Sequence, residues 1–224
     1  MKTLKFLTFP LLLSLFFVLI SAKPDEKETV RVQNSANVLK DFAEMKESIP
    51  SELIKKYEGI VIIPKLLNGG LLIGGKRGKG VAMVKLGDGK WSDPVFVTLT
   101  GGSVGFQIGV QSVDLILVFR HKTVLTDIKK GNFTIGGDIS AAAGPLNRNK
   151  SAVSDAKLEA EIYSYSRSRG LFAGISLNGS GLNIDNNANS NFYGNDDSSQ
   201  DIFAASKNTS EEVTALKESL KNFK

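Results

Sequence analysis

The sequence has no cysteine and only one histidine among its 224 residues. Without cysteine the chain forms no disulfide, offers no thiol nucleophile and has no cysteine that could carry a lipid. Transition-metal sites are built mainly from cysteine and histidine, so a single histidine leaves carboxylates as the main ligands. His121 stands between Arg120 and Lys122, which is typical of an exposed residue rather than a general base. We therefore expect no metal and no cofactor.

Long apolar runs are also scarce, and the clearest one lies at the start of the chain. Residues 6–20 are apolar with three interruptions, and two lysines precede them. A basic start, a short apolar run and a small residue at Ala22 are the layout of a cleavable signal peptide, whereas a membrane span needs about 20 apolar residues. The sequence predicts a signal peptide over residues 1–22; a retained N-terminal anchor is the alternative. We expect an exported protein, periplasmic or secreted, that is peripheral to a membrane and is not a lipoprotein.

Acidic residues are sparse in the middle of the chain. From Lys76 to Lys150 there are eleven Lys or Arg and five Asp, whereas residues 185–224 hold seven acidic residues and four Lys. A basic middle segment suits anionic lipid headgroups or nucleic acid, because both present dense phosphate charge. An ordinary solvated surface would have the same composition. The charge pattern therefore permits an anionic partner without identifying it.

Four segments have the sequence features of helices. Residues 28–45 carry apolar side chains every three or four positions, as an amphipathic helix does. Ser51 is expected to cap a short second helix. A weaker pattern predicts a helix around residues 124–128. Near the C-terminus, Thr209 and Glu212 form a T-x-x-E capping box ahead of an apolar stripe, which predicts a helix over about 209–223.

Glycine is frequent between residues 60 and 182, where it separates short stretches rich in β-branched residues. These stretches are predicted to be strands: 60–64, 71–75, 81–86, 95–100, 104–110, 113–120, 132–143, 161–168 and 171–177. Glycine inside a strand weakens it, so bulges, sharp coiling or close approach of another segment must require it. The sequence therefore predicts an α+β fold. Its core would be a strongly coiled, largely antiparallel β-sheet or small barrel-like core with flanking N-terminal and C-terminal helices.

Turn and loop signals complete the expected organisation. Gly87-Asp88-Gly89 is predicted to be a hairpin turn, because Asp-Gly supplies the positive φ that such turns need. Residues 186–200 are rich in Asn, Asp and Ser and are predicted to form a loop. The sequence contains no internal repeat of fixed period and no long internal linker. We expect a single domain over residues 23–224.

Two motifs resemble catalytic sites, but each lacks the context it needs. A G-x-S-x-G motif surrounds Ser103, and Asp114 and His121 follow in hydrolase order. A nucleophile elbow requires a helix after the serine, whereas the residues that follow have a strand pattern. Gly70–Lys76 matches G-x-x-x-x-G-K, but Arg77 replaces the Ser or Thr that would bind Mg²⁺. We expect no catalytic residue and no enzyme, with a hydrolase that uses Ser103 as an alternative hypothesis.

Nine segments occur in the order found in the SYLF domain, and together they resemble that family over about residues 32–194. They are Gly59–Pro64, Gly69–Gly80, Trp91–Pro94, Gly101–Gly109, Gly136–Asp138, Ala143–Pro145, Tyr163–Ser166, Gly170–Gly174 and Phe192–Gly194. The resemblance implies binding of phosphoinositides or other anionic phospholipids, a β-barrel-like core surrounded by helices, and no catalytic activity. It also implies an amphipathic N-terminal helix that takes part in lipid binding, for which Val32–Met45 is the counterpart by position.

Five basic residues are the candidates for headgroup contact. Lys76, Arg77 and Lys79 are expected on one exposed loop, with Arg120 and Lys122 nearby, while the apolar face of the first helix inserts. We expect a non-enzymatic, lipid-binding protein of the bacterial envelope; the alternative is a structural or protein-interaction component of the periplasm or outer envelope. Anionic lipids or a membrane surface are the expected partners, together with an envelope protein. No nucleic acid is expected, and no actin, because an exported bacterial protein does not meet it.

Overall fold

The computed structural model describes residues 24–45, 48–128, 133–144, 160–173, 175–194 and 197–223. The signal peptide predicted over residues 1–22 lies outside them. The helices are α1 (Pro24–Glu44), α2 (Ser51–Lys56), α3 (Thr123–Thr126), α5 (Asn186–Tyr193), α6 (Ser199–Phe203) and α7 (Glu211–Lys221). The strands are β1 (Gly59–Val84), β2 (Val95–Phe119), β3 (Phe133–Ile135), β4 (Ala141–Ala143), β5 (Ile162–Ser168), β6 (Leu171–Phe172) and β7 (Ser180–Ile184).

β1 and β2 form one long two-stranded ribbon. They pair antiparallel from Gly59 opposite Phe119 to Ala82 opposite Val95, with two irregularities in the register. The prediction of six separate strands between residues 60 and 120 is therefore wrong. The glycine clusters bend and bulge these strands without ending them, because a bulge lets a strand change direction and still keep its partner.

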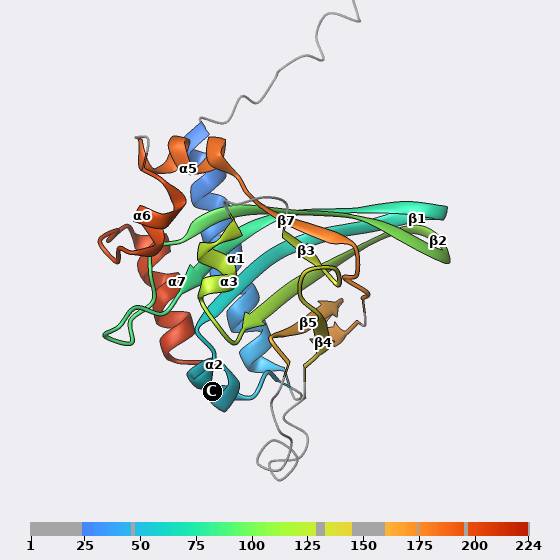
Figure 1. Cartoon of the computed structure of the whole chain (residues 1–224), viewed down its shortest axis with the longest axis horizontal. Helices are drawn as coiled ribbons and strands as arrows, with labels where there is room; N and C mark the ends of the chain where they lie inside the picture. The colour runs from blue at the N-terminus through green and yellow to red at the C-terminus, as the bar shows by residue number, and fades with distance from the viewer. Residues whose placement is uncertain are drawn as a thin grey trace, which may run out of the picture.

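The ribbon folds back on itself, and glycine lets its two halves touch. A Cβ atom built on Gly80 would lie 1.9 Å from the carbonyl oxygen of Ile62, and one on Gly78 would lie 2.5 Å from Cγ2 of Ile63. Since these residues meet, the part of β1 between them must turn round, and its partner in β2 turns with it. Figure 1 shows the turned part projecting away from the helices. This turned part is the middle of both strands, residues 65–77 of β1 and 100–113 of β2. Because it forms the projecting end of the folded ribbon, we call it the ribbon end.

The remaining strands extend the sheet on both sides of the ribbon. β2 pairs antiparallel with β5 near its C-terminal end and with β7 near its N-terminal end. β3 joins β7, β6 joins β5, and β4 runs parallel to β5. The result is an α+β fold with a nearly closed, barrel-like, mixed sheet and flanking helices, which confirms the predicted fold class.

Alternate residues of the sheet face two hydrophobic cores, as the period of a strand requires. The inner core lies between the two halves of the folded ribbon and includes Val61, Ile63, Ala82, Val97, Leu115 and Leu117. The outer core lies beneath the helices and joins sheet residues to α1 and α7; it includes Ile60, Ile62, Met83, Phe96, Leu39, Phe42, Leu216 and Leu220. The sheet is thus buried on both faces wherever helices cover it.

The helices follow the sequence in part. α1 and α2 were expected, but Pro50 occupies the N-cap of α2 and no side chain caps it, so the capping role predicted for Ser51 is wrong. α7 was also expected, although Ser210 rather than Thr209 accepts from the backbone of Val213. The hairpin turn is confirmed, because Gly89 has φ of 79° and donates to the Leu86 carbonyl at 2.9 Å.

The predicted loop over residues 186–200 is wrong, because α5 and α6 occupy most of it. Asp185 caps α5 by accepting from the backbone of Ala188, and Gly194 ends it with φ of 68°. Ser198 and Asp201 form a capping box for α6. The polar run misled because most of its asparagines lie inside α5, while Asp185 and Ser198 are caps whose short polar side chains satisfy free N–H groups of a first turn.

Candidate functional site

Lys76, Arg77 and Lys79 lie within strand β1 and not on the exposed loop that the sequence suggested. Successive side chains of a strand point to opposite faces. Lys76 is accordingly buried, with 6% of its surface exposed, whereas Arg77 and Lys79 are exposed. The prediction of one loop presenting all three cations is therefore wrong.

Lys76 faces the interior of the folded ribbon. Its ammonium group donates to the carbonyl oxygen of Ser176, and among the described residues no carboxylate pairs with it. Burial lowers the pKa of Lys76, because removing an ammonium from water disfavours its charged form. The side chain is therefore directed into the domain and not toward solvent.

Replacing Lys76 with Met should leave the free energy of unfolding equal to the wild-type value or raise it by about 1 kcal/mol, because it removes a buried amine and keeps the apolar volume. Urea denaturation followed by circular dichroism measures this. Arg77→Met serves as the control on the exposed face and should change stability little. A loss of several kcal/mol for Lys76→Met would show that the buried amine is a required structural contact.

Lys79 belongs to a small ion cluster where the start of α5 meets α1 and β1. Its Nζ lies 3.3 Å from Oδ2 of Asp185, and Nη1 of Arg31 lies 3.1 Å from the same oxygen. The Lys79 side chain still keeps 49% of its surface in water. Arg31 also pairs with Glu28, its Nη2 lying 3.7 Å from Oε1, so two cations face two carboxylates and the exposed Lys79 is largely neutralised.

Arg77 lies on the same side of strand β1 as Lys79, two positions before it. It stands opposite Thr100 in the ribbon. Its side chain is exposed, and no carboxylate pairs with it within the described ranges. Arg77 and Lys79 are the two residues of the predicted set that the structure brings together on an accessible surface.

Arg120 and Lys122 are part of a different neighbourhood. Arg120 follows the last residue of β2, and its Nη1 lies 4.0 Å from Glu161. The half-buried Lys122 donates its backbone N–H to Glu58 at 3.1 Å. The structure therefore does not join these two residues to Arg77 and Lys79 in one basic patch.

The apolar face of α1 is covered. Val32, Leu39 and Phe42 are each 0% exposed and pack into the outer core against β1 and α7. The predicted insertion of this face into lipid is not available in the observed packing, because the same side chains stabilise the domain. Val30, 50% exposed, is the large apolar side chain of α1 that remains in solvent.

The residues of the hydrolase motif are spread along the ribbon and do not converge. Asp114 accepts from Arg167 at 2.9 Å and from the backbone of Lys65 at 3.0 Å. His121 lies 3.8 Å from Glu161, beyond the end of β2. Ser103 is inside β2, opposite Gly74, and the strand continues after it to Phe119, where a nucleophile elbow would need a helix. The elbow geometry that the motif requires is absent here.

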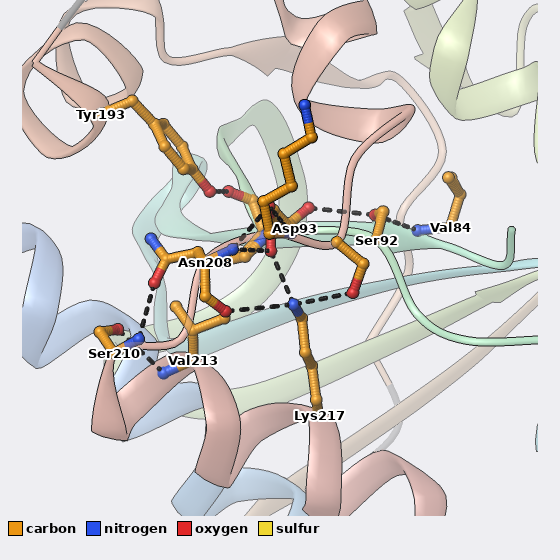
Figure 2. A network of polar contacts seen from close by, with 11 residues as sticks. Val84, Ser92, Asp93, Tyr193, Asn208, Ser210, Val213 and Lys217 are labelled. Carbon is orange, nitrogen blue, oxygen red and sulfur yellow. Dashed lines mark hydrogen bonds and ion pairs between the residues drawn. The ribbon is translucent and has the colours of Figure 1, made fainter.

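A buried polar network around Asp93 joins the connection between β1 and β2 to the C-terminal segment (Figure 2). The carboxylate of Asp93, which is 4% exposed, accepts from the backbone of Lys207 at 2.8 Å and from Nζ of Lys217 at 2.7 Å. Ser92 accepts from Val84 and donates to the Asp93 carbonyl, both at 3.0 Å. All groups of this network are satisfied by one another, so it fixes α7 in place and offers no reactive atom.

Sequence reasoning missed this network. The Trp91–Pro94 segment entered the sequence analysis only through the family resemblance; Trp91 is buried, with the ammonium of Lys85 5.4 Å from its ring centroid. The partners of Asp93 lie 114 to 124 residues further along the chain. An acidic residue beside a proline and a tryptophan was the available signal, but nothing in the sequence identified its partners.

Charge is distributed unevenly along the ribbon. Residues 59–87 contain five basic residues and no acidic one, and residues 94–113 contain no charged residue at all. The acidic residues that contact the ribbon's exposed cations come from other elements, as Asp185 does. Of the five, Lys65, Arg77 and Lys79 are exposed, so the folded ribbon presents a positive surface that can attract anions.

Within the described ranges, no cluster of three or more histidine and acidic side chains could hold a metal ion. None of the described helices combines the length and apolar character needed to cross a membrane.

Comparison with known proteins identifies the family. The sequence model of the Ysc84 family matches residues 100–223, and this family is described as "Las17-binding protein actin regulator". The chain is 36% identical over 172 residues to SH3 domain-containing YSC84-like protein 1 of Xenopus laevis, covering 74% of this chain and 51% of the relative. It is 34% identical over 177 residues to the Homo sapiens protein of the same name, covering 76% and 52%.

A yeast protein extends the comparison. LAS seventeen-binding protein 3 of Saccharomyces cerevisiae is 35% identical over 149 residues, covering 65% of this chain and 32% of the yeast protein. The chain spans about half the length, or less, of the curated relatives it matches. These names overturn the expectation that actin has no connection with a protein of this kind. They describe binding rather than a reaction, and the chain belongs to the Ysc84 family, whose domain is the SYLF domain.

Proposed function

We propose that this chain binds the surface of anionic membranes without catalysing a reaction. The observation that carries the proposal is that residues 59–87 contain no acidic residue and expose three basic side chains, Lys65, Arg77 and Lys79. Anionic lipids attract such a surface with about 1 kcal/mol for each basic residue close to it. Lys79 shares Asp185 with Arg31, so its contribution is smaller than that of Arg77. The contact is therefore weak and sensitive to salt.

Vesicle flotation tests the proposal. Phosphatidylcholine vesicles with and without phosphatidylserine are mixed with the wild type, with Arg77→Gln/Lys79→Gln, and with a control, Lys55→Gln/Lys56→Gln, that removes two exposed lysines of α2. The wild type and the control should float with the anionic vesicles at low salt, and the Arg77/Lys79 variant should bind about tenfold less. All three proteins share residues 1–22, so any contribution of those residues cancels. Equal flotation of both double variants would refute the assignment of the site.

The names of the relatives favour a second function, contact with an actin-related protein. The family is described as an actin regulator that binds Las17, and the matched region of this chain, residues 100–223, includes α7 and most of the described strands. Cosedimentation with filamentous actin tests the direct form of this contact. Pelleting that depends on actin would support it, and a chain that stays in the supernatant at every actin concentration would contradict it.

The compartment of the protein decides which partner it meets. We propose that residues 1–22 direct export, on the basis of their basic start and short apolar run. Mass spectrometry of the protein recovered from its own cells tests this. A mature chain that begins at Lys23 would support export and an envelope membrane. An intact N-terminus in the cytosolic fraction would contradict export and leave an actin-related partner accessible.

A further inference from the structure

We propose that the ribbon end enters the interfacial layer of an anionic membrane, with Leu67 and Val110 as its apolar anchors. This names the part of the molecule that contacts lipid, and it rests on the membrane binding proposed above. The two side chains are 51% and 78% exposed, which sets them apart from the many large apolar residues of β1 and β2 that are buried. Leu66, directly before Leu67, is 0% exposed.

The register of the ribbon places the two anchors side by side. Leu67 stands opposite Ser112, and Val110 stands opposite Gly69. Residues opposite one another in an antiparallel pair share a face, as do residues two apart in one strand. Leu67 and Val110 are therefore diagonal neighbours on one face, within reach of one another. Together they form an apolar spot in solvent.

A third exposed apolar side chain lies on the adjacent hairpin. Leu171, 73% exposed, stands opposite Ser168 in the β5–β6 pair. The hydroxyl of Ser168 donates to the carbonyl oxygen of Ser112 at 3.3 Å, which joins this hairpin to the ribbon end. Of the four large apolar side chains that are exposed among the described residues, three thus belong to neighbouring strands; the fourth is Val30 on α1.

The charges around these side chains identify the occupant. Lys65 and Arg169 are exposed and lie two positions from Leu67 and Leu171 in sequence. Residues 94–113 supply no acidic side chain, and Asp114 at their border shares the guanidinium of Arg167 with Asp41, whose side chain is 47% exposed. Apolar side chains flanked by cations fit a bilayer with anionic headgroups, which offers hydrocarbon to the former and phosphate to the latter.

The position of the ribbon end supports the same conclusion. It projects beyond the helices in Figure 1, so it can reach a flat surface that the rest of the domain does not obstruct. The apolar face of α1 is fully used in the outer core. Insertion at the ribbon end requires no helix to leave the domain.

Fluorescence at single introduced cysteines tests the insertion directly, because the wild-type chain has no cysteine. Val110→Cys, Leu67→Cys and the control Val30→Cys are each labelled with an environment-sensitive fluorophore and mixed with phosphatidylserine-containing vesicles. The probes at positions 110 and 67 should shift to the blue and be quenched by brominated lipid. The probe at position 30 should remain in water.

A second set of variants measures the contribution of the anchors to binding. Leu67→Gln/Val110→Gln should lower vesicle partitioning about tenfold, because each anchor loses a favourable transfer of apolar area, whereas Val30→Gln should leave it unchanged. Unaltered urea midpoints would show that the fold is intact. If the wild type floats but the position-110 probe stays in water and the double variant binds normally, the insertion is refuted while membrane binding stands. If the wild type binds no vesicle, both proposals fail.

Discussion

Replacing Asp93 with Asn should lower the free energy of unfolding by about 3 kcal/mol. The substitution keeps the shape of the side chain and removes its charge. Lys217, whose side chain is 20% exposed, would then keep a largely buried ammonium without its counter-ion. In the wild type the carboxylate of Asp93 accepts hydrogen bonds from the backbone N–H groups of Lys207 and Asn208. The amide of the variant has one acceptor oxygen fewer, so it cannot accept all of these hydrogen bonds. Leaving a buried charge unpaired is among the most destabilising single changes a domain can undergo.

Urea denaturation of two further variants makes this test specific. Asp88→Asn is the matched control, because Asp88 is an exposed carboxylate that pairs with Lys90 in the nearby hairpin, and it should unfold like the wild type. Asp93→Asn/Lys217→Met removes the stranded ammonium and should recover part of the lost stability, as a double-mutant cycle would register. A midpoint for Asp93→Asn equal to that of Asp88→Asn would show that the network does not hold α7.

The sequence predicted the elements with a strong local signal. The apolar spacing of residues 28–45 became α1, and the alternation of residues 161–168 became β5. In both segments the local pattern and the tertiary packing agree, so propensity alone was informative. The strand lengths were not predictable in the same way, because glycine ends a strand in most sequences but bends the ribbon here, where the opposite half of β1 packs against Gly78 and Gly80.

The candidate site was predicted less well, for a geometric reason. The predicted basic cluster assumed that residues adjacent in sequence present their side chains on the same surface. In a strand, adjacent side chains point to opposite faces, so Lys76 is buried and Arg77 is exposed. The exposed apolar pair Leu67 and Val110 depends on the register between β1 and β2. These two hydrophobic residues are 43 positions apart in sequence, so no local pattern indicates that they share an exposed surface. Only the pairing of the two strands shows that they are neighbours.

Replacing Gly80 with Ala should lower stability by about 3 kcal/mol, because the added methyl group has no space. It would lie 1.9 Å from the Ile62 carbonyl oxygen and 2.9 Å from Cα of Ile63, and both of these are backbone atoms. A flexible side chain could turn away, but backbone can yield only if the two halves of the ribbon separate. That separation would open the inner core, in which Val61, Ile63 and Ala82 are each 0% exposed.

Gly102→Ala is the control that distinguishes crowding from a general effect of adding a side chain to the ribbon. Gly102 lies on β2, opposite Gly75, and a Cβ there would meet nothing within 4 Å. Alanine restricts the unfolded chain more than glycine does, so this variant should be unchanged or more stable by about 0.5 kcal/mol. Urea denaturation compares the two variants, and near-ultraviolet circular dichroism around Trp91 reports whether the packing loosens. Equal stability of Gly80→Ala and Gly102→Ala would mean that the halves of the ribbon do not touch at Gly80, and the barrel-like closure of the sheet would have to be abandoned.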